Sequence, residues 1–259
     1  NAGSRDEKPG EEGMAHFIEH CMFKGTAKRK AFHILSRMDA VGGEINAYTT
    51  KEETCIYSSF LSHHYQRAIE LITDISFNST FPDKEIEKEK VVIIDEINSY
   101  LDDPSDQIFD DFEELVFDGH PLGKTILGEK KQIKKFNAGL VRQFIGEHYT
   151  TDQMVFASVG PVSAGKLKKY LEKHLNGIPE SRSGSGRSSK PRATSAPSTS
   201  AATSPSPRTP STSSSSSASA SRRPSGTSRS AWTLTSSTPA AVVTPSAPAL
   251  AWRRASCSW

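Results

Sequence analysis

The most informative segment of this 259-residue chain is Gly13-Met-Ala-His-Phe-Ile-Glu-His-Cys-Met-Phe-Lys24. Its apolar residues are spread around the whole helical wheel, which is typical of a helix buried on several sides, and Gly25 is a plausible stop. Two histidines and a glutamate are costly to bury in such a helix unless they bind a metal or form hydrogen bonds. The segment therefore predicts a buried helix that carries a polar site.

His16 and His20 are four residues apart, so both imidazoles lie on one face of this helix, and Glu19 lies close to that face. A zinc site with two histidines needs a third protein ligand and leaves one position for a water molecule, whose pKa the metal lowers to about 7. A nearby glutamate that is not a ligand can accept the proton of that water and pass it to the leaving amine. Because an H-x-x-E-H match can also arise by chance, the motif needs support from the rest of the chain.

A second helix, expected from about residue 83 to 102, supplies candidates for the third ligand. Glu89 and Glu96 are seven residues apart and therefore share one face of this helix, whereas Asp95 points about 100° away from Glu96. Apolar residues at 91–94 and 97 flank Glu96, an unusual setting for a carboxylate. The alternative is that these acids belong to a solvated helix face, as most helix acids do.

Elsewhere, the spacing of apolar residues predicts helices at about 29–40, 63–77, 105–117, 138–148 and 163–175. Strands are expected at 44–50, 54–61 and 154–159, and the first two could pair as neighbours. Long helices with few strands favour an α+β fold, in which an antiparallel-type sheet packs against several long helices. No stretch approaches the roughly 18–20 consecutive apolar residues of a membrane span, so we expect no membrane partner.

Composition divides the chain near residue 180. Residues 181–259 include 26 Ser among 79 residues and no Asp or Glu, and they carry a net charge of +10, which leaves −8 on residues 1–180. We expect one domain at 1–180, with its natural start before Asn1, and a disordered low-complexity tail at 181–259 that cannot bury enough apolar surface to fold. A reading-frame change would account for the tail. Its basic residues could instead bind a polyanion, but no nucleic-acid-binding fold accompanies them, so we expect no nucleic-acid partner.

H-x-x-E-H is the inverted zinc motif, and the chain resembles the amino-terminal half of the insulinase, pitrilysin and mitochondrial processing peptidase family. Glu96 follows His20 by 76 residues, close to the spacing of the third ligand in that family. Other stretches similar to the family are Gly3–Glu7, Gly42–Thr49 and His120–Gly123. The resemblance implies that His16, His20 and Glu96 bind one zinc ion per chain and that Glu19 is the general base. It also implies that Glu89 is an acid that steadies a ligand or the charge of the site.

The resemblance further implies that Asn46, Ala47, Tyr48 and Thr49 border the cleft and pair with an extended peptide substrate by strand addition; the alternative is a plain core strand. Family enzymes combine two similarly folded halves, so we expect one half of a processing-peptidase-like two-domain subunit, which needs a second half or a partner subunit. Two functions follow. The chain is a zinc metalloendopeptidase, or it is a metal-binding subunit or fragment that is catalytically incomplete without its partner.

Overall fold

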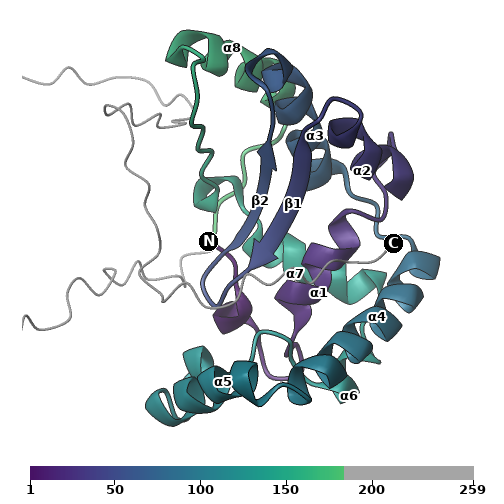
Figure 1. The fold of residues 1–259 in the computed structure, drawn as a ribbon, viewed down its shortest axis with the longest axis vertical. Coiled ribbons are helices and arrows are strands. Elements are labelled where there is room, and N and C mark those ends of the chain that lie inside the picture. The colour runs from purple at the N-terminus through teal and green to yellow at the C-terminus, as the bar shows by residue number, and fades with distance from the viewer. Residues whose placement is uncertain (184–259) are drawn as a thin grey trace, which may run out of the picture. The chain divides into compact units, whose positions relative to one another are not determined.

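The computed structural model describes residues 1–183 (Figure 1). The helices are α1 (Met14–Met22), α2 (Ala31–Asp39), α3 (Tyr65–Asn78), α4 (Asp83–Leu101), α5 (Pro104–Val116), α6 (Lys130–Ile133), α7 (Ala138–His148) and α8 (Ala164–Leu175). The strands are β1 (Glu44–Thr49) and β2 (Thr54–Ser59). The predicted α+β class is confirmed. The tail expected at 181–259 lies, from residue 184 on, outside the described residues.

The two strands form an antiparallel hairpin, in which Glu44 lies opposite Ser59 and Thr49 opposite Thr54. β1 packs against α1 and α2, and β2 packs against α3. Ala47 is the buried residue of β1 and belongs to the main core. The hairpin therefore holds the carboxyl end of β1 close to the helix that carries the H-x-x-E-H motif.

Helix α1 lies at the centre of the domain, between the hairpin and helices α4 and α7 (Figure 1). Met14, Phe17 and Ile18 are almost completely buried, and the ring of Phe17 meets that of Phe136 edge to face at 5.2 Å between centroids. Burying a side chain of this size contributes about 1.5–3 kcal/mol to folding. The prediction that this helix is buried on several sides is confirmed.

The start of α1 is fixed by two features that hold its first turn in place. Gly13 precedes the helix with φ 93°, and a Cβ atom there would lie 2.7 Å from the backbone oxygen of Leu127. The backbone N–H groups of Gly13 and Ala15 donate to the buried carboxylate of Glu7, at 3.0 and 2.9 Å. Glu7 thus satisfies donors that the first turn of a helix leaves without partners, which sets the position of His16 one residue further on.

The expectation of a strand at 154–159 is wrong. Within residues 1–183 the sheet contains β1 and β2 alone, and the side chains of Val155 and Val159 are 86% and 96% exposed. The segment is anchored at one end instead, because the Tyr65 hydroxyl donates to the backbone oxygen of Val159 at 3.1 Å. A strand forms only where a neighbour offers N–H and C=O groups to its backbone, and the apolar pattern of the segment does not provide that neighbour.

Candidate metal centre

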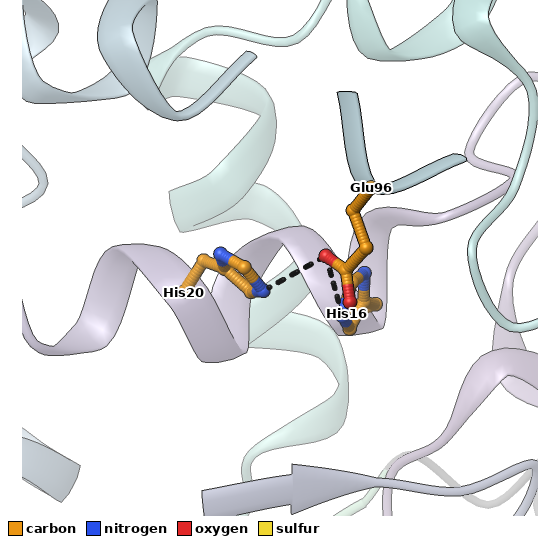
Figure 2. A group of neighbouring side chains, drawn as sticks. All are labelled: His16, His20 and Glu96. Carbon is orange, nitrogen blue, oxygen red and sulfur yellow. Dashed lines mark ion pairs between the residues drawn. The ribbon is translucent and has the colours of Figure 1, made fainter. Parts of the chain in front are cut away.

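Three side chains that are far apart in sequence converge on one point of the domain. His16 and His20 project from α1, and Glu96 reaches toward them from α4 (Figure 2). Glu96 Oε2 lies 3.5 Å from His20 Nε2 and 3.8 Å from His16 Nε2. Ligands that surround one tetrahedral zinc ion at ordinary bond lengths are about 3.3 Å apart. These two distances are close to that spacing, and all three ligand atoms lie within 4.8 Å of one another.

The state of the Glu96 carboxylate indicates that this group fits a metal. Its Oε2 atom is buried and has no hydrogen-bond partner in residues 1–183, although it points between the two imidazoles. A buried polar atom without a partner costs about 1–3 kcal/mol. A cation with a preference for imidazole and carboxylate ligands, such as zinc, would satisfy this oxygen and both histidines at once.

The pKa values of the two histidines are shifted in opposite directions because their surroundings differ. Burial lowers the pKa of His16 to about 3, with a further contribution from His20, so His16 is neutral and its contact with Glu96 is not an ion pair. Burial also lowers the pKa of His20, but a hydrogen bond with Glu89 and the charges of the nearby carboxylates outweigh it and raise that pKa above 6.5. The carboxylates around His20 therefore favour a positive charge at this point of the site.

Glu89, which the family resemblance implied to be an acid that supports the site, lies beside a candidate ligand. Its Oε2 atom is 3.3 Å from His20 Nδ1, and its Oε1 atom is 2.8 Å from Lys24 Nζ. Burial raises the pKa of Glu89, but the hydrogen bonds with His20 and Lys24 outweigh burial and lower it. Glu89 thus joins a candidate metal ligand to a buried lysine.

Lys24 is the residue that the sequence reasoning missed. It follows the last turn of α1, and its side chain is 8% exposed. The available signal was its position four residues after His20, in a segment that the sequence predicted to be helical up to Lys24, although the helix itself ends at Met22. Spacing alone does not show which acid of α4 this lysine meets.

Glu19 occupies the same helix as the two histidines but contacts the hairpin rather than α4. Thr49 Oγ1, at the end of β1, donates to Glu19 Oε2 at 2.6 Å. Burial raises the pKa of Glu19, and the Thr49 hydrogen bond and the charge of His20 oppose this shift only in part. The hydrogen bond to Thr49 is a second contact that the sequence did not reveal.

The residues predicted to bind substrate form the middle and end of β1. Asn46 is exposed, Tyr48 and Thr49 are half-buried, and Ala47 is buried against the core. In the described part of the chain β1 pairs with β2 alone, so its other edge is open. The structure thus brings one end of an open strand edge to the candidate metal centre through the contact between Thr49 and Glu19.

Comparison with known protein families identifies the relationship. The family model described as insulinase, peptidase family M16, matches residues 1–130, which is half of the chain. The chain belongs to this family. A second model, the peptidase M16 inactive domain, matches residues 135–218, a range that crosses the boundary expected near residue 180. The resemblance inferred from the sequence is confirmed.

Relatives of this insulinase-family chain are named zinc proteases. An uncharacterized zinc protease of Rickettsia bellii is 42% identical over 176 residues, which cover 68% of this chain and 43% of the relative. The uncharacterized zinc protease YmxG of Bacillus subtilis is 39% identical over 166 residues, covering 64% and 41%. The chain therefore spans less than half the length of these curated relatives.

Solved structures show the same fold at lower sequence identity. The periplasmic protease PqqL of Escherichia coli matches with a TM-score of 0.65 and 23% identity, over 72% of this chain and 21% of that one. A protease from Helicobacter pylori also matches with a TM-score of 0.65 and 23% identity, over 70% and 44%. No helix in residues 1–183 combines the length and the apolar character needed to cross a membrane.

Proposed function

We propose that the chain carries the catalytic centre of a zinc-dependent metalloendopeptidase, which hydrolyses peptide bonds in peptides or extended protein segments. The observation that carries this proposal is the convergence of His16, His20 and Glu96, with Glu19 on the same helix as the two histidines. His16 Nε2, His20 Nε2 and Glu96 Oε2 would hold one zinc ion. When bound, the ion would lower the pKa of a water molecule and polarise the substrate carbonyl.

Glu19 is the proposed general base and then the general acid. Thr49 engages one oxygen of its carboxylate, which leaves the Oε1 atom as the proposed proton acceptor. Burial raises the pKa of Glu19 above its ordinary value, which makes its carboxylate a stronger base toward the proton of the water molecule. Glu19 would take a proton from water and deliver it to the nitrogen of the leaving amine.

The substrate is proposed to lie along the open edge of β1, with its extended backbone paired to residues 46–49. In such strand addition, main-chain hydrogen bonds supply the affinity, and pockets for alternate side chains supply the specificity. Because Thr49 contacts Glu19, a peptide that occupies this edge would lie next to the proposed general base. This arrangement would orient the scissile bond relative to the two histidines.

A second candidate function is a metal-binding part that becomes active only with a partner half. The exposed apolar face of α5 favours it, since no residue of this amphipathic helix is buried and Phe112 and Leu115 are 63% and 80% exposed. Large exposed apolar patches commonly mark interaction sites. Under this proposal residues 1–183 bind zinc and position Glu19, and the partner completes the cleft.

Peptide cleavage by the purified full chain distinguishes the two candidates. The first candidate predicts that the chain hydrolyses an unstructured peptide. It also predicts that Glu19→Gln abolishes this hydrolysis and leaves the zinc content unchanged. The second predicts zinc binding without hydrolysis by wild type. Cleavage that survives Glu19→Gln would refute the mechanism in both cases.

A further inference from the structure

Beside the proposed zinc site lies a buried pair whose contacts lead directly to one histidine. Lys24 Nζ is 2.8 Å from Glu89 Oε1, and the side chains of Lys24 and Glu89 are 8% and 6% exposed. The other carboxylate oxygen, Oε2, is 3.3 Å from His20 Nδ1. Lys24, Glu89 and His20 thus form a hydrogen-bonded series, and His20 Nε2 faces Glu96 at its end.

The two histidines are supported unequally. His16 Nδ1 is buried without a hydrogen-bond partner in the described part of the chain, whereas His20 Nδ1 contacts Glu89. A histidine that ligates a metal normally donates its other ring N–H to a carboxylate, backbone oxygen or water, which fixes the orientation of the ring. Only His20 has such a carboxylate among residues 1–183, so the geometry of its ring depends on where Glu89 is held.

An ion pair with Lys24 and a hydrogen bond with His20 hold the Glu89 carboxylate, and the ion pair is the shorter contact. The glutamate side chain has rotatable bonds, so a carboxylate that loses one of two partners can turn away from the other. Lys24 is itself constrained, because burial leaves its side chain little room to move. The lysine is therefore placed to fix which way Glu89 Oε2 points.

We propose that Lys24 is a positioning residue for zinc binding, which holds Glu89 so that Glu89 orients the imidazole of His20. This inference rests on the proposed zinc site. Lys24 does not touch the metal or the substrate in this account. An alternative role, a buried ion pair that only joins the end of α1 to α4, would affect the stability of the fold but not the zinc affinity of the folded protein.

The test is a zinc titration of the full chain in competition with a chelating dye. Loss of an outer hydrogen-bond partner of a ligating histidine typically weakens metal binding 10–100-fold, and we expect Lys24→Met to weaken zinc binding on the order of 10-fold. Glu89→Gln should weaken it at least as much. In the Glu89→Gln background, Lys24→Met should cause no further loss, because Lys24 acts through Glu89.

Lys90→Met is the matched control, since Lys90 is also a poorly exposed lysine paired with a glutamate, Glu87, but it lies outside the series. It should leave zinc affinity unchanged, and Lys24→Arg should recover part of the loss by restoring a charged donor. If Lys24→Met does not fold, Lys24→Arg is the deciding variant. A zinc affinity of Lys24→Arg that lies between the affinities of wild type and Glu89→Gln supports the proposal.

Three results would overturn the proposal. Wild-type zinc affinity in folded Lys24→Met would show that the pair is only structural. Tighter binding would show that the lysine acts only as a repelling charge. Independent, additive losses in the double variant would show that Lys24 does not act through Glu89. Failure of wild type to bind zinc would instead refute the proposed zinc site, and this inference with it.

Discussion

Zinc binding should weaken as the pH falls, because a proton and the metal compete for His20. The pKa of His20 is raised above its ordinary 6.5 by Glu89 and the other carboxylates, despite the opposing effect of burial. At pH 6.5 and below, the metal-free site therefore holds a proton on His20 that zinc must displace. His16, with a pKa of about 3, is already neutral in this range and adds no second proton.

The expected magnitude follows from this proton count. One displaced proton weakens zinc binding about tenfold for each pH unit below the pKa of His20, which corresponds to about 1.4 kcal/mol. Above that pKa the affinity becomes independent of pH. At the acidic end the dependence steepens, since burial also raises the pKa of the Glu96 carboxyl, which must likewise be ionised to bind.

The assay is dye competition at a series of pH values from 5.5 to 8, with the zinc affinity of the dye calibrated at each pH. Glu89→Gln is the informative variant, because removal of this carboxylate lowers the pKa of His20 and should move the bend in the curve to lower pH. Equal affinities at pH 5.5 and 6.5 would contradict the reasoning. A hundredfold change per pH unit near pH 6.5 would also contradict it, since a second group besides His20 would then be protonated in that range.

Three further predictions address catalysis, folding and association. Thr49→Val removes the 2.6 Å hydrogen bond to the proposed general base, so kcat/KM for peptide hydrolysis should fall about tenfold, for a loss of about 1.4 kcal/mol. The zinc content should be unchanged, and Thr49→Ser should recover the rate. An unaltered rate in Thr49→Val would contradict this role of Thr49. Gly13→Ala should lower the midpoint of urea unfolding more than Gly10→Ala, because both glycines have positive φ but only a Cβ at 13 meets backbone atoms; equal effects would show that the contact is unimportant. Light scattering should detect self-association of the wild-type chain, and the double substitution Phe112→Glu and Leu115→Glu should reduce it. A monomeric wild type would contradict the proposal that the exposed apolar face of α5 mediates association.

The helices and the placement of the two histidines on one helix face could be predicted because their determinants are local. Periodicity predicted a helix at about 83–102, and α4 spans Asp83–Leu101. The i, i+4 spacing placed His16 and His20 on one face, whereas the apolar flanks of Glu96 left a solvated helix face open and the family resemblance singled out Glu96. The extent of α4 and the shared face of the two histidines each depend on the geometry of a single helix, which the sequence encodes directly.

What escaped prediction depends on contacts between elements that are distant in sequence. The strand at 154–159 needed a neighbouring backbone, which the apolar pattern of Val155 and Val159 could not supply. The contact of Lys24 with Glu89 depends on how α1 crosses α4, and that of Thr49 with Glu19 depends on how the hairpin packs on α1. Tertiary packing, rather than local propensity, therefore determines whether the strand forms and which residues make the two contacts.

The central claim is tested most directly by the zinc content of the purified chain, measured by elemental analysis in wild type, His20→Ala and Glu96→Gln. Asp95→Asn is the matched control, because Asp95 is exposed on α4 next to Glu96 and is absent from the converging group. The account predicts one zinc per chain in wild type and in Asp95→Asn, and none in the other two variants. A folded wild type without zinc, or zinc retained in Glu96→Gln and His20→Ala, would contradict it.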